Sequence, residues 1–255
     1  MSVRFFVLRR RHLMLLGAVL ASAAILAVAY APAAVMASAV ARQLPIYCVE
    51  RDQKVCSISF DAAWGADNTE KILDVLDEYG IKTTFFVVSA WAEQYPDTAK
   101  AIVERGHELM NHSSKHDHYN SLTADQIVAD VNKCNDVIET LTGVCPTLIR
   151  CPFGEYDDHV INAIRSTGME PIQWDVDSLD WKGISAAEIT KRVTGKVGSG
   201  SIVLFHNAGE HTPEALPDIL QYLRREGYEI VPISQILLDG EYTINHEGRQ
   251  CAVKE

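Results

Sequence analysis

From residue 54 onward, the chain alternates short apolar runs with longer segments whose apolar residues recur at helical spacing. Short runs rich in β-branched and aromatic residues predict buried strands, and apolar positions three or four residues apart predict amphipathic helices. The predicted strands are 55–60, 82–88, 108–111, 147–150, 171–175, 201–206 and 229–232. The predicted helices are 67–79, a segment ending near 104, 123–141, 157–167, 185–197, 213–226 and a short turn at 234–238.

Two of these helices carry recognisable end signals. Gly80 follows the apolar positions of 67–79 and predicts the end of that helix. Thr123 and Gln126 stand three residues apart at the start of 123–141, the spacing of a capping box.

Polar side chains recur where the apolar runs stop. Strands that alternate with helices through short connections predict a parallel sheet, which either closes into a barrel or stays open with two helical layers. A barrel draws its catalytic groups from the ends of several strands, whereas an open sheet usually carries a glycine-rich phosphate loop, which is missing after 55–60. The polar groups at the strand ends are Asp61, His112, Arg150, the segment 175–180 and His206. We therefore predict an α/β fold, an irregular (β/α)7–8 barrel.

The first 42 residues differ from the rest of the chain. Four arginines, the last of them Arg11, precede an almost uncharged run from 13 to about 41. Such a run is long enough to cross a hydrocarbon core of about 30 Å as a helix, with its basic flank in the cytoplasm. Although 37–39 resembles a small-residue cleavage site, the run exceeds the length usual for a cleaved signal. We expect a transmembrane anchor in 1–42 and one extracytoplasmic catalytic domain in 43–255, secreted if cleavage occurs near Ala39.

Charge limits the class of partner. The 255 residues carry a formal net charge of -11 and 47% hydrophobic residues. An acidic surface is unsuited to holding the phosphates of nucleic acid, so we expect no nucleic-acid partner and favour a neutral or cationic one. Six cysteines without a C-x-x-C spacing do not indicate a zinc knuckle, and Cys56 fits a small buried hydrophobe. The sequence does not indicate an oligomeric state.

His112 and His116 stand four residues apart. Two rings at that spacing can meet one divalent cation, but they can equally be solvated loop histidines. The pair gains weight from the other polar groups at the strand ends.

The remaining candidates also have ordinary alternatives. Asp61 is either a general base at the end of a buried strand or a helix N-cap. Arg150 is either a surface residue or the group that keeps Asp61 ionised. His206 is either a satisfied core histidine or a general acid. We favour the catalytic interpretation for all three because they share the same predicted edge of the sheet.

The segment 175–181 leaves more alternatives open. Asp177 and Asp180 are either helix caps or part of the site. Trp181 is either core or the wall of a small apolar pocket, and its position alone does not decide between them.

Five ordered motifs resemble those of the polysaccharide deacetylases, also called the NodB-homology or carbohydrate esterase 4 family. They are Ser-Phe-Asp at 59–61, His-Ser-x-x-His at 112–116, Arg-x-Pro-Phe at 150–153, Asp-Ser-Leu-Asp-Trp at 177–181 and Leu-Phe-His at 204–206. The resemblance extends from about 54 to 238. Within the family, Phe-Asp-x-x-Trp-Gly at 60–65 is most similar to the membrane-anchored sporulation deacetylases.

The resemblance implies hydrolysis of N-acetyl groups on amino sugars of a cell-wall glycan, peptidoglycan or a chitin-like polymer. By this resemblance, Asp61 is the base that Arg150 orients, and His206 is the acid that Asp180 tunes. His112 and His116 are implied to be the metal ligands. The Phe153 backbone N–H is implied to contact the oxyanion, and Trp181 and Leu204 to line the acetate pocket.

One position departs from the family pattern. Ala62 stands where the family usually has a second aspartate that binds the metal. Two histidines are fewer than the three protein ligands typical of a catalytic zinc, so binding of zinc or cobalt stays open. Asp67 is near enough in sequence to substitute for the missing ligand, but it fits a helix N-cap equally well.

Two other functions therefore remain. One is a metal-independent amidase that acts on a small cyclic amide. The other is a pseudoenzyme that binds glycan without hydrolysing it. The predicted anchor favours a wall polymer over a small cytosolic amide as the partner.

Overall fold

The computed structural model describes residues 42–253. The chain divides into two units, Met1–Arg42 and Gln43–Glu255, and the second holds all of the secondary structure below. Among residues 42–253, no helix has the length and apolarity needed to cross a membrane. The anchor predicted in 1–42 lies outside these residues.

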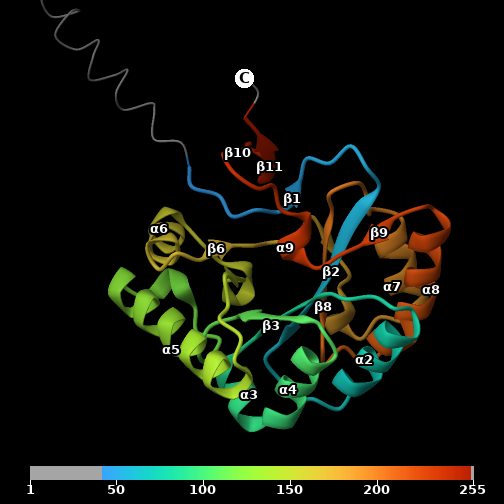
Figure 1. Ribbon diagram of the computed structural model, residues 1–255, viewed down its shortest axis with the longest axis horizontal. Coiled ribbons are helices and arrows are strands. Elements are labelled where there is room, and N and C mark those ends of the chain that lie inside the picture. The colour runs from blue at the N-terminus through green and yellow to red at the C-terminus, as the bar shows by residue number, and fades with distance from the viewer. Residues whose placement is uncertain (1–41, 254–255) are drawn as a thin grey trace, which may run out of the picture. The chain divides into compact units, whose positions relative to one another are not determined.

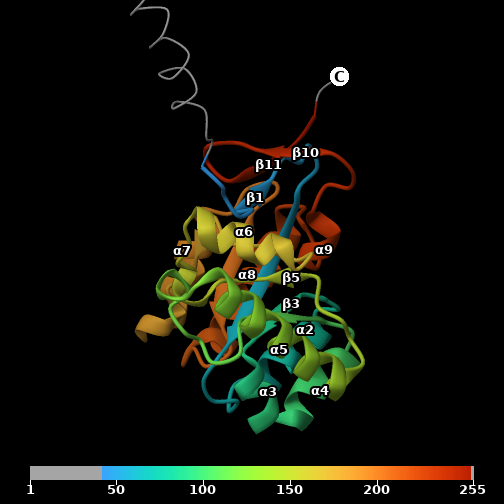
Figure 2. The same cartoon turned by 90° about the vertical axis from the view of Figure 1, so that its left-hand side faces the viewer.

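An eight-stranded parallel sheet forms the centre of the domain. Its order is β6-β5-β4-β3-β2-β8-β7, with β9 paired to the start of β2. The strands are β2 (Val55–Ala62), β3 (Thr84–Val87), β4 (Glu108–Asn111), β5 (Leu148–Ile149), β6 (Glu170–Pro171), β7 (Val176–Asp177), β8 (Ile202–His206) and β9 (Glu229–Ile230). The longest, β2, runs through the middle of the sheet in Figures 1 and 2.

The prediction of a closed barrel was wrong in one respect. Strands β6 and β7 are the two edges, and within residues 42–253 no ladder joins them. Only the residues between Pro171 and Val176 connect them, too short a link for the crossover that two neighbouring parallel strands require. Pro171 also lacks an N–H to donate. The sheet is therefore an open, half-barrel version of the predicted α/β fold.

The N-terminal part of the domain lies beside this opening. Ile46 bridges Ile172, and Cys48 bridges Ser201 next to β8. The Gln173 N–H also donates to the Ile46 carbonyl at 2.7 Å. These contacts satisfy backbone groups that would otherwise be left unpaired at the sheet edges.

Helices cover the outer side of the sheet (Figure 1). They are α2 (Thr69–Glu78), α3 (Ser89–Gln94), α4 (Pro96–Glu104), α5 (Ala124–Thr142), α6 (Asp158–Ser166), α7 (Ala186–Thr194), α8 (Thr212–Arg225) and α9 (Ile233–Ile236). The capping box of Thr123 and Gln126 is confirmed. The helix predicted to end near 104 is two helices, because Pro96 starts a new one after Tyr95.

A second sheet was not predicted. It has three short strands in the order β1-β11-β10, namely β1 (Cys48–Val49), β11 (Arg249–Ala252) and β10 (Tyr242–Ile244). Strand β1 pairs with β11 from the far end of the domain, and Figures 1 and 2 both show the three strands together beyond the main sheet. Strands of two to four residues leave too short a pattern for sequence periodicity to detect.

The two faces of β2 lie in different surroundings, one in the apolar core and the other beside Arg150. Cys56, Ile58, Phe60 and Ala62 belong to the core cluster under the helices, and all four are fully buried. On the other face, Ser59 and Asp61 point toward Arg150. Because side chains alternate along a strand, Asp61 and Ala62 belong to different environments. Cys56 is a buried thiol, as predicted, and all six cysteines are free.

Candidate active site

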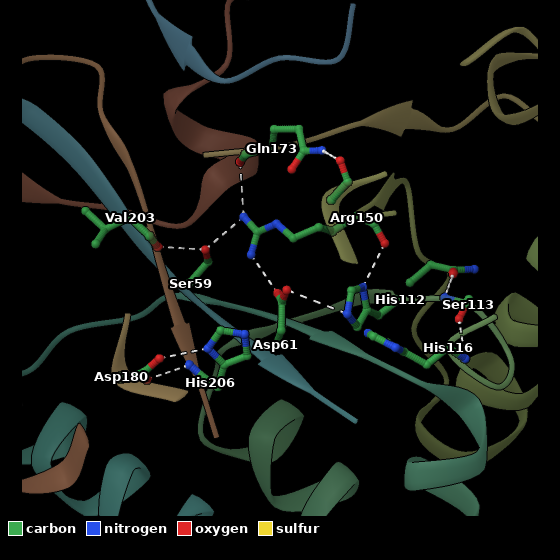
Figure 3. Close-up of polar contacts among 12 residues, drawn as sticks. Ser59, Asp61, His112, Ser113, His116, Arg150, Gln173, Asp180, Val203 and His206 are labelled. Carbon is green, nitrogen blue, oxygen red and sulfur yellow. Dashed lines mark hydrogen bonds and ion pairs between the residues drawn. The ribbon is translucent and has the colours of Figure 1, made fainter. Parts of the chain in front are cut away.

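A cavity of about 550 Å³ opens at the carboxyl ends of the strands. Asp61, the penultimate residue of β2, and His206, the last residue of β8, are Cα partners in the β2–β8 ladder. Both line the cavity, and so do His112 and His116 from the segment after β4. The other lining residues include Trp64, Phe153, Trp174, Asp177, Trp181, Leu204 and Asn207. Figure 3 shows Asp61 between Arg150, His112 and His206.

Asp61 is held by a buried arginine. Arg150 Nη1 donates to Asp61 Oδ1 at 2.6 Å, and Arg150 Nη2 donates to Ser59 Oγ at 3.0 Å. Arg150 is fully buried, and its Cζ lies 4.2 Å from the ring centroid of Phe86. Burial by itself raises the pKa of Asp61, but Arg150, His112 and His206 together lower it below the ordinary carboxyl value. Asp61 is therefore ionised at neutral pH.

His206 is held by a buried carboxylate. Its Nδ1–H donates to Asp180 Oδ1 at 2.7 Å, and its backbone N–H donates to Asp180 Oδ2 at 2.8 Å. Thr212 Oγ1 completes the set by donating to Asp180 Oδ2 at 2.6 Å. Burial by itself lowers the pKa of His206, but the Asp180 hydrogen bond and the nearby carboxylates raise it above the usual histidine value.

The closeness of these groups restricts position 209. A Cβ added to Gly209 would lie 2.7 Å from Asp180 Oδ2. Only glycine therefore permits the turn after β8 to pass beside the Asp180 carboxylate.

His112 has one fixed orientation. Its Nδ1–H donates to the Arg150 carbonyl at 2.7 Å, which leaves the lone pair of the neutral ring on Nε2. That Nε2 lies 3.6 Å from Asp61 Oδ2. Burial lowers the pKa of His112 and favours the neutral ring.

His116 is less well satisfied. Its ring lies edge-on to His112, with the centroids 4.9 Å apart, and its buried Nδ1 has no hydrogen-bond partner. Burial lowers the pKa of His116 to about 4, so this ring is also neutral at pH 7. Its φ of 62° is in the left-handed region, which is uncommon for a residue other than glycine.

Helix α5 fixes the loop that carries both histidines. The Asn111 side chain donates to Asn135 at 2.7 Å and accepts from the Ser113 N–H at 2.7 Å. Asp130 accepts from the Ser114 N–H at 2.9 Å. These bonds connect the loop to a long, well-packed helix and offset its unusual backbone.

Aromatic side chains surround the mouth of the cavity. Trp64, Phe153 and Trp181 are 63%, 51% and 59% exposed, although large apolar side chains are usually covered. Phe153 has a φ of 59°, followed by a left-handed Gly154 whose added Cβ would lie 2.7 Å from Trp174. The turn therefore holds Phe153 at the cavity wall.

The donor set does not fit a three-ligand metal centre. Within residues 42–253, no group of three or more His, Cys, Asp or Glu side chains is arranged to hold a metal ion. His112 and His116 supply two imidazoles, while Asp61 is engaged by Arg150. Ala62 is fully buried under the helices and does not line the cavity. Asp67 is exposed outside the cavity lining, and Asn68 rather than Asp67 precedes α2, so neither interpretation of Asp67 was right.

The structure brings the predicted site residues together. Two of them, Arg150 and Asp180, lie fully buried behind the cavity, and the other seven line it. Sequence reasoning gave no role to Trp64, Asn207 or Thr212. Trp64 had one usable signal, because a tryptophan combines a large apolar surface with a polar N–H and is enriched at interfaces. Thr212 had none, since only the folded chain brings it to Asp180.

Comparisons with known proteins agree with this geometry. Residues 49–172 match the family model described as polysaccharide deacetylase. The chain is 32% identical over 188 residues to the peptidoglycan-N-acetylmuramic acid deacetylase PdaC of Bacillus subtilis, covering 74% of this chain and 40% of PdaC. It is also 32% identical over 181 residues to a peptidoglycan-N-acetylglucosamine deacetylase of Bacillus cereus, covering 69% of this chain and 66% of that protein.

A solved structure gives a similar result. The wild-type CE4 family pseudoenzyme from Bacillus anthracis superposes with a TM-score of 0.73 at 31% identity, covering 75% of this chain and 68% of that one. The chain belongs to the polysaccharide deacetylase family. The chain spans less than half the length of PdaC.

Proposed function

We propose that the chain hydrolyses N-acetyl groups on amino sugars of peptidoglycan. One observation carries this proposal: Asp61 and His206 are ladder partners at one cavity, and each has a buried partner of opposite charge. Amide hydrolysis needs a base for water and an acid for the leaving amine, held in opposite protonation states. The lowered pKa of Asp61 and the raised pKa of His206 both favour that combination.

The proposed reaction follows from these two groups. Asp61 takes a proton from water, whose oxygen attacks the acetyl carbon, and Arg150 keeps the Asp61 carboxylate oriented. The backbone N–H of Phe153 donates to the carbonyl oxygen as it becomes negative. His206, with Asp180 bound to Nδ1, then donates its Nε2 proton to the amine nitrogen as the carbon–nitrogen bond breaks. Acetate and a free amino sugar leave, with Trp181 and Leu204 beside the methyl group.

The test is acetate release by the full chain. Purified protein is incubated with N-acetylated peptidoglycan and with chitin oligomers, with and without added zinc or cobalt. We expect acetate from at least one polymer and a rate lower by on the order of 10²–10⁴ from an Asp61→Asn variant. Absence of acetate under every condition would contradict the proposal.

Three observations favour a second function. Position 62 is alanine, the described residues offer no three-ligand metal group, and a pseudoenzyme is among the similar structures. The chain would then bind glycan without hydrolysing it. Retention on insoluble peptidoglycan together with no acetate release would support this alternative, whereas turnover of small cyclic amides but not of glycan would indicate a metal-independent amidase.

The two histidines can also bind a divalent ion such as zinc or cobalt, with low affinity. His112 Nε2 carries a lone pair, and His116 Nδ1 is buried without a partner, so two nitrogens are free to accept a divalent ion. We propose weak binding at this pair and assign it no step in the reaction.

We also propose that the domain acts outside the cytoplasm, anchored by a helix within 1–42. The support is the basic flank and the uncharged run in the sequence. Protease added to intact protoplasts is expected to remove the domain. Protection of the domain until lysis would reverse the assigned orientation.

A further inference from the structure

Gln173 is a buried polar residue beside the site, with no role in the reaction described above. It lies between β6 and β7, at the open edge of the sheet, and is 2% exposed. Its side-chain Nε2 donates to the Gly154 carbonyl at 2.8 Å, and its own carbonyl accepts from Arg150 Nη2 at 3.2 Å. Figure 3 shows the Arg150 guanidinium between Gln173 and Asp61. One residue therefore contacts both the arginine that holds the base and the turn that follows β5.

That turn, Pro152–Gly154, depends on contacts from outside itself. Phe153 and Gly154 are both left-handed, with φ of 59° and 67°. A residue other than glycine in this region carries strain, which persists only where the surroundings fix the backbone. The two backbone hydrogen bonds within the turn, each 3.1 Å long, do not use the Gly154 carbonyl, which instead accepts from Gln173. Gln173 therefore fixes a peptide group that the turn itself leaves unheld.

Packing restricts the turn on the same side. A Cβ added to Gly154 would lie 2.7 Å from the Trp174 ring and 3.4 Å from the Gln173 carboxamide. Gln173 is held in its turn, since its N–H donates to the Ile46 carbonyl at 2.7 Å. The ring limits movement of the turn toward Trp174, and the hydrogen bond limits movement away from it. The direction of the Phe153 N–H, the proposed oxyanion donor, follows from the position of this turn.

Stability alone does not account for a glutamine at this position. Because the Gly154 carbonyl can only accept, the amide nitrogen of Gln173 must face it, and Oε1 points elsewhere. Within residues 42–253, that buried Oε1 has no hydrogen-bond partner. A buried acceptor without a partner costs about 1–3 kcal/mol, which offsets the roughly 1 kcal/mol gained from a typical hydrogen bond. The glutamine therefore adds little net stability, and its distinctive contribution is the donor that holds Gly154.

We infer that Gln173 is a positioning residue that holds the Phe153 N–H where the oxyanion forms. The inference rests on the proposed function, which places that oxyanion in this cavity. Gln173 does not line the cavity, so it acts through the Gly154 carbonyl. Negative charge develops on the carbonyl oxygen only as water attacks, so the Phe153 N–H acts mainly in the transition state. Loss of the Gln173 donor should therefore lower kcat and leave KM nearly unchanged.

The first test is steady-state deacetylation of a soluble chitin oligomer by the full chain carrying Gln173→Leu. This variant has a similar volume but no donor. We expect kcat to fall by about tenfold to a hundredfold, because a misplacement of about 1 Å near the reacting atoms can cost about 10²-fold. KM should stay within about twofold of wild type. Gln173→Met, which also lacks a donor, should give the same split, and unchanged kcat in both variants would overturn the inference.

Gln250 provides the matched control. It is 1% exposed and lies in β11 of the second sheet. Its side chain is satisfied at both ends by the Leu238 backbone, with Oε1 accepting at 2.8 Å and Nε2 donating at 3.4 Å. Gln250→Leu should lower the melting temperature more than Gln173→Leu does, and it should leave kcat unchanged. An equal loss of kcat in Gln250→Leu would mean that general destabilisation is the cause, and it would overturn the inference.

Amide hydrogen exchange without substrate separates this inference from the deacetylase proposal. Exchange over residues 150–156 is compared among wild type, Gln173→Leu and Gln250→Leu. We expect faster exchange there in Gln173→Leu alone, because only this variant loses a contact to the turn. Wild-type protein that releases no acetate, with this difference in exchange present, would contradict the deacetylase proposal alone. Equal exchange over 150–156 in all three proteins would overturn the inference.

Discussion

The two sides of the cavity differ in how completely their polar groups are satisfied. On one side, Asp61 is paired with Arg150 and His206 with Asp180, through hydrogen bonds of 2.6 and 2.7 Å. On the other side, His112 and His116 face each other without a third ligand, and His116 Nδ1 has no partner. Both sides lie at the ends of strands of one sheet.

This difference supports the proposal that Asp61 and His206 carry out the chemistry. A buried charge persists only where a partner stabilises it, and Asp61 and His206 each have such a partner in Arg150 and Asp180. The imidazole side keeps both rings neutral and packs the His116 ring against Trp64. The first side has what proton transfer needs, while the second has too few ligands for a catalytic metal.

The largest effect should come from the base. Asp61→Asn keeps the shape of the side chain but cannot accept a proton from water, so acetate release should fall by on the order of 10²–10⁴. Asp67→Asn is the matched control, because it makes the same change on an exposed residue of the following loop and should leave the rate unchanged. Initial rates of acetate release measure both. An Asp61→Asn enzyme as fast as wild type would remove Asp61 from the reaction.

The Asp61–Arg150 pair should also couple in stability. Arg150→Met leaves a buried carboxylate without its partner and should cost about 3–5 kcal/mol of unfolding free energy. The double variant Asp61→Asn/Arg150→Met should be more stable than Arg150→Met alone, because no unpaired charge remains. Urea unfolding measures all four proteins. Strict additivity of the two changes would show that the pair is not coupled.

The acid side predicts a pH effect of definite sign. His206 is a competent acid only while protonated, so the rate should fall as pH rises through its raised pKa. Asp180→Asn removes the carboxylate that raises this pKa, and the basic limb of the rate profile should move to lower pH. Glu188→Gln, on the surface capping box of α7, is a suitable control. A basic limb that stays in place would separate it from His206.

The smallest effect concerns the imidazole side. Removing metal with a chelator should change the melting temperature of the wild-type protein little, because two imidazoles bind zinc weakly. Ala62 lies fully buried under the helices and does not line the cavity, so Ala62→Asp should leave zinc affinity unchanged in a calorimetric titration and lower the melting temperature, because it buries a carboxylate without a partner. His112→Ala is the control and should abolish the weak zinc binding of the wild-type protein. A clear gain in zinc affinity in Ala62→Asp would show that position 62 reaches the histidines.

Local sequence determined most of the secondary structure and the identity of the site residues. Periodicity gave the positions of β2, β4, β8 and α5, and Thr123 with Gln126 gave the start of α5, because these signals depend on residues within a few turns. The order of polar groups at strand ends also follows from sequence, since parallel strands place their carboxyl ends at one edge.

Tertiary structure alone decided the rest. Whether β6 and β7 meet, which terminal strands pair, and that Thr212 reaches Asp180 depend on contacts between residues far apart in the chain. Asp61 and Ala62 are neighbours in sequence, yet the pleat of β2 directs one toward Arg150 and the other under the helices. Likewise, the ring centroids of Trp64 and His116 come within 4.7 Å only because β2 and β4 lie in the same sheet, since packing between strands, not the local pattern, sets their separation.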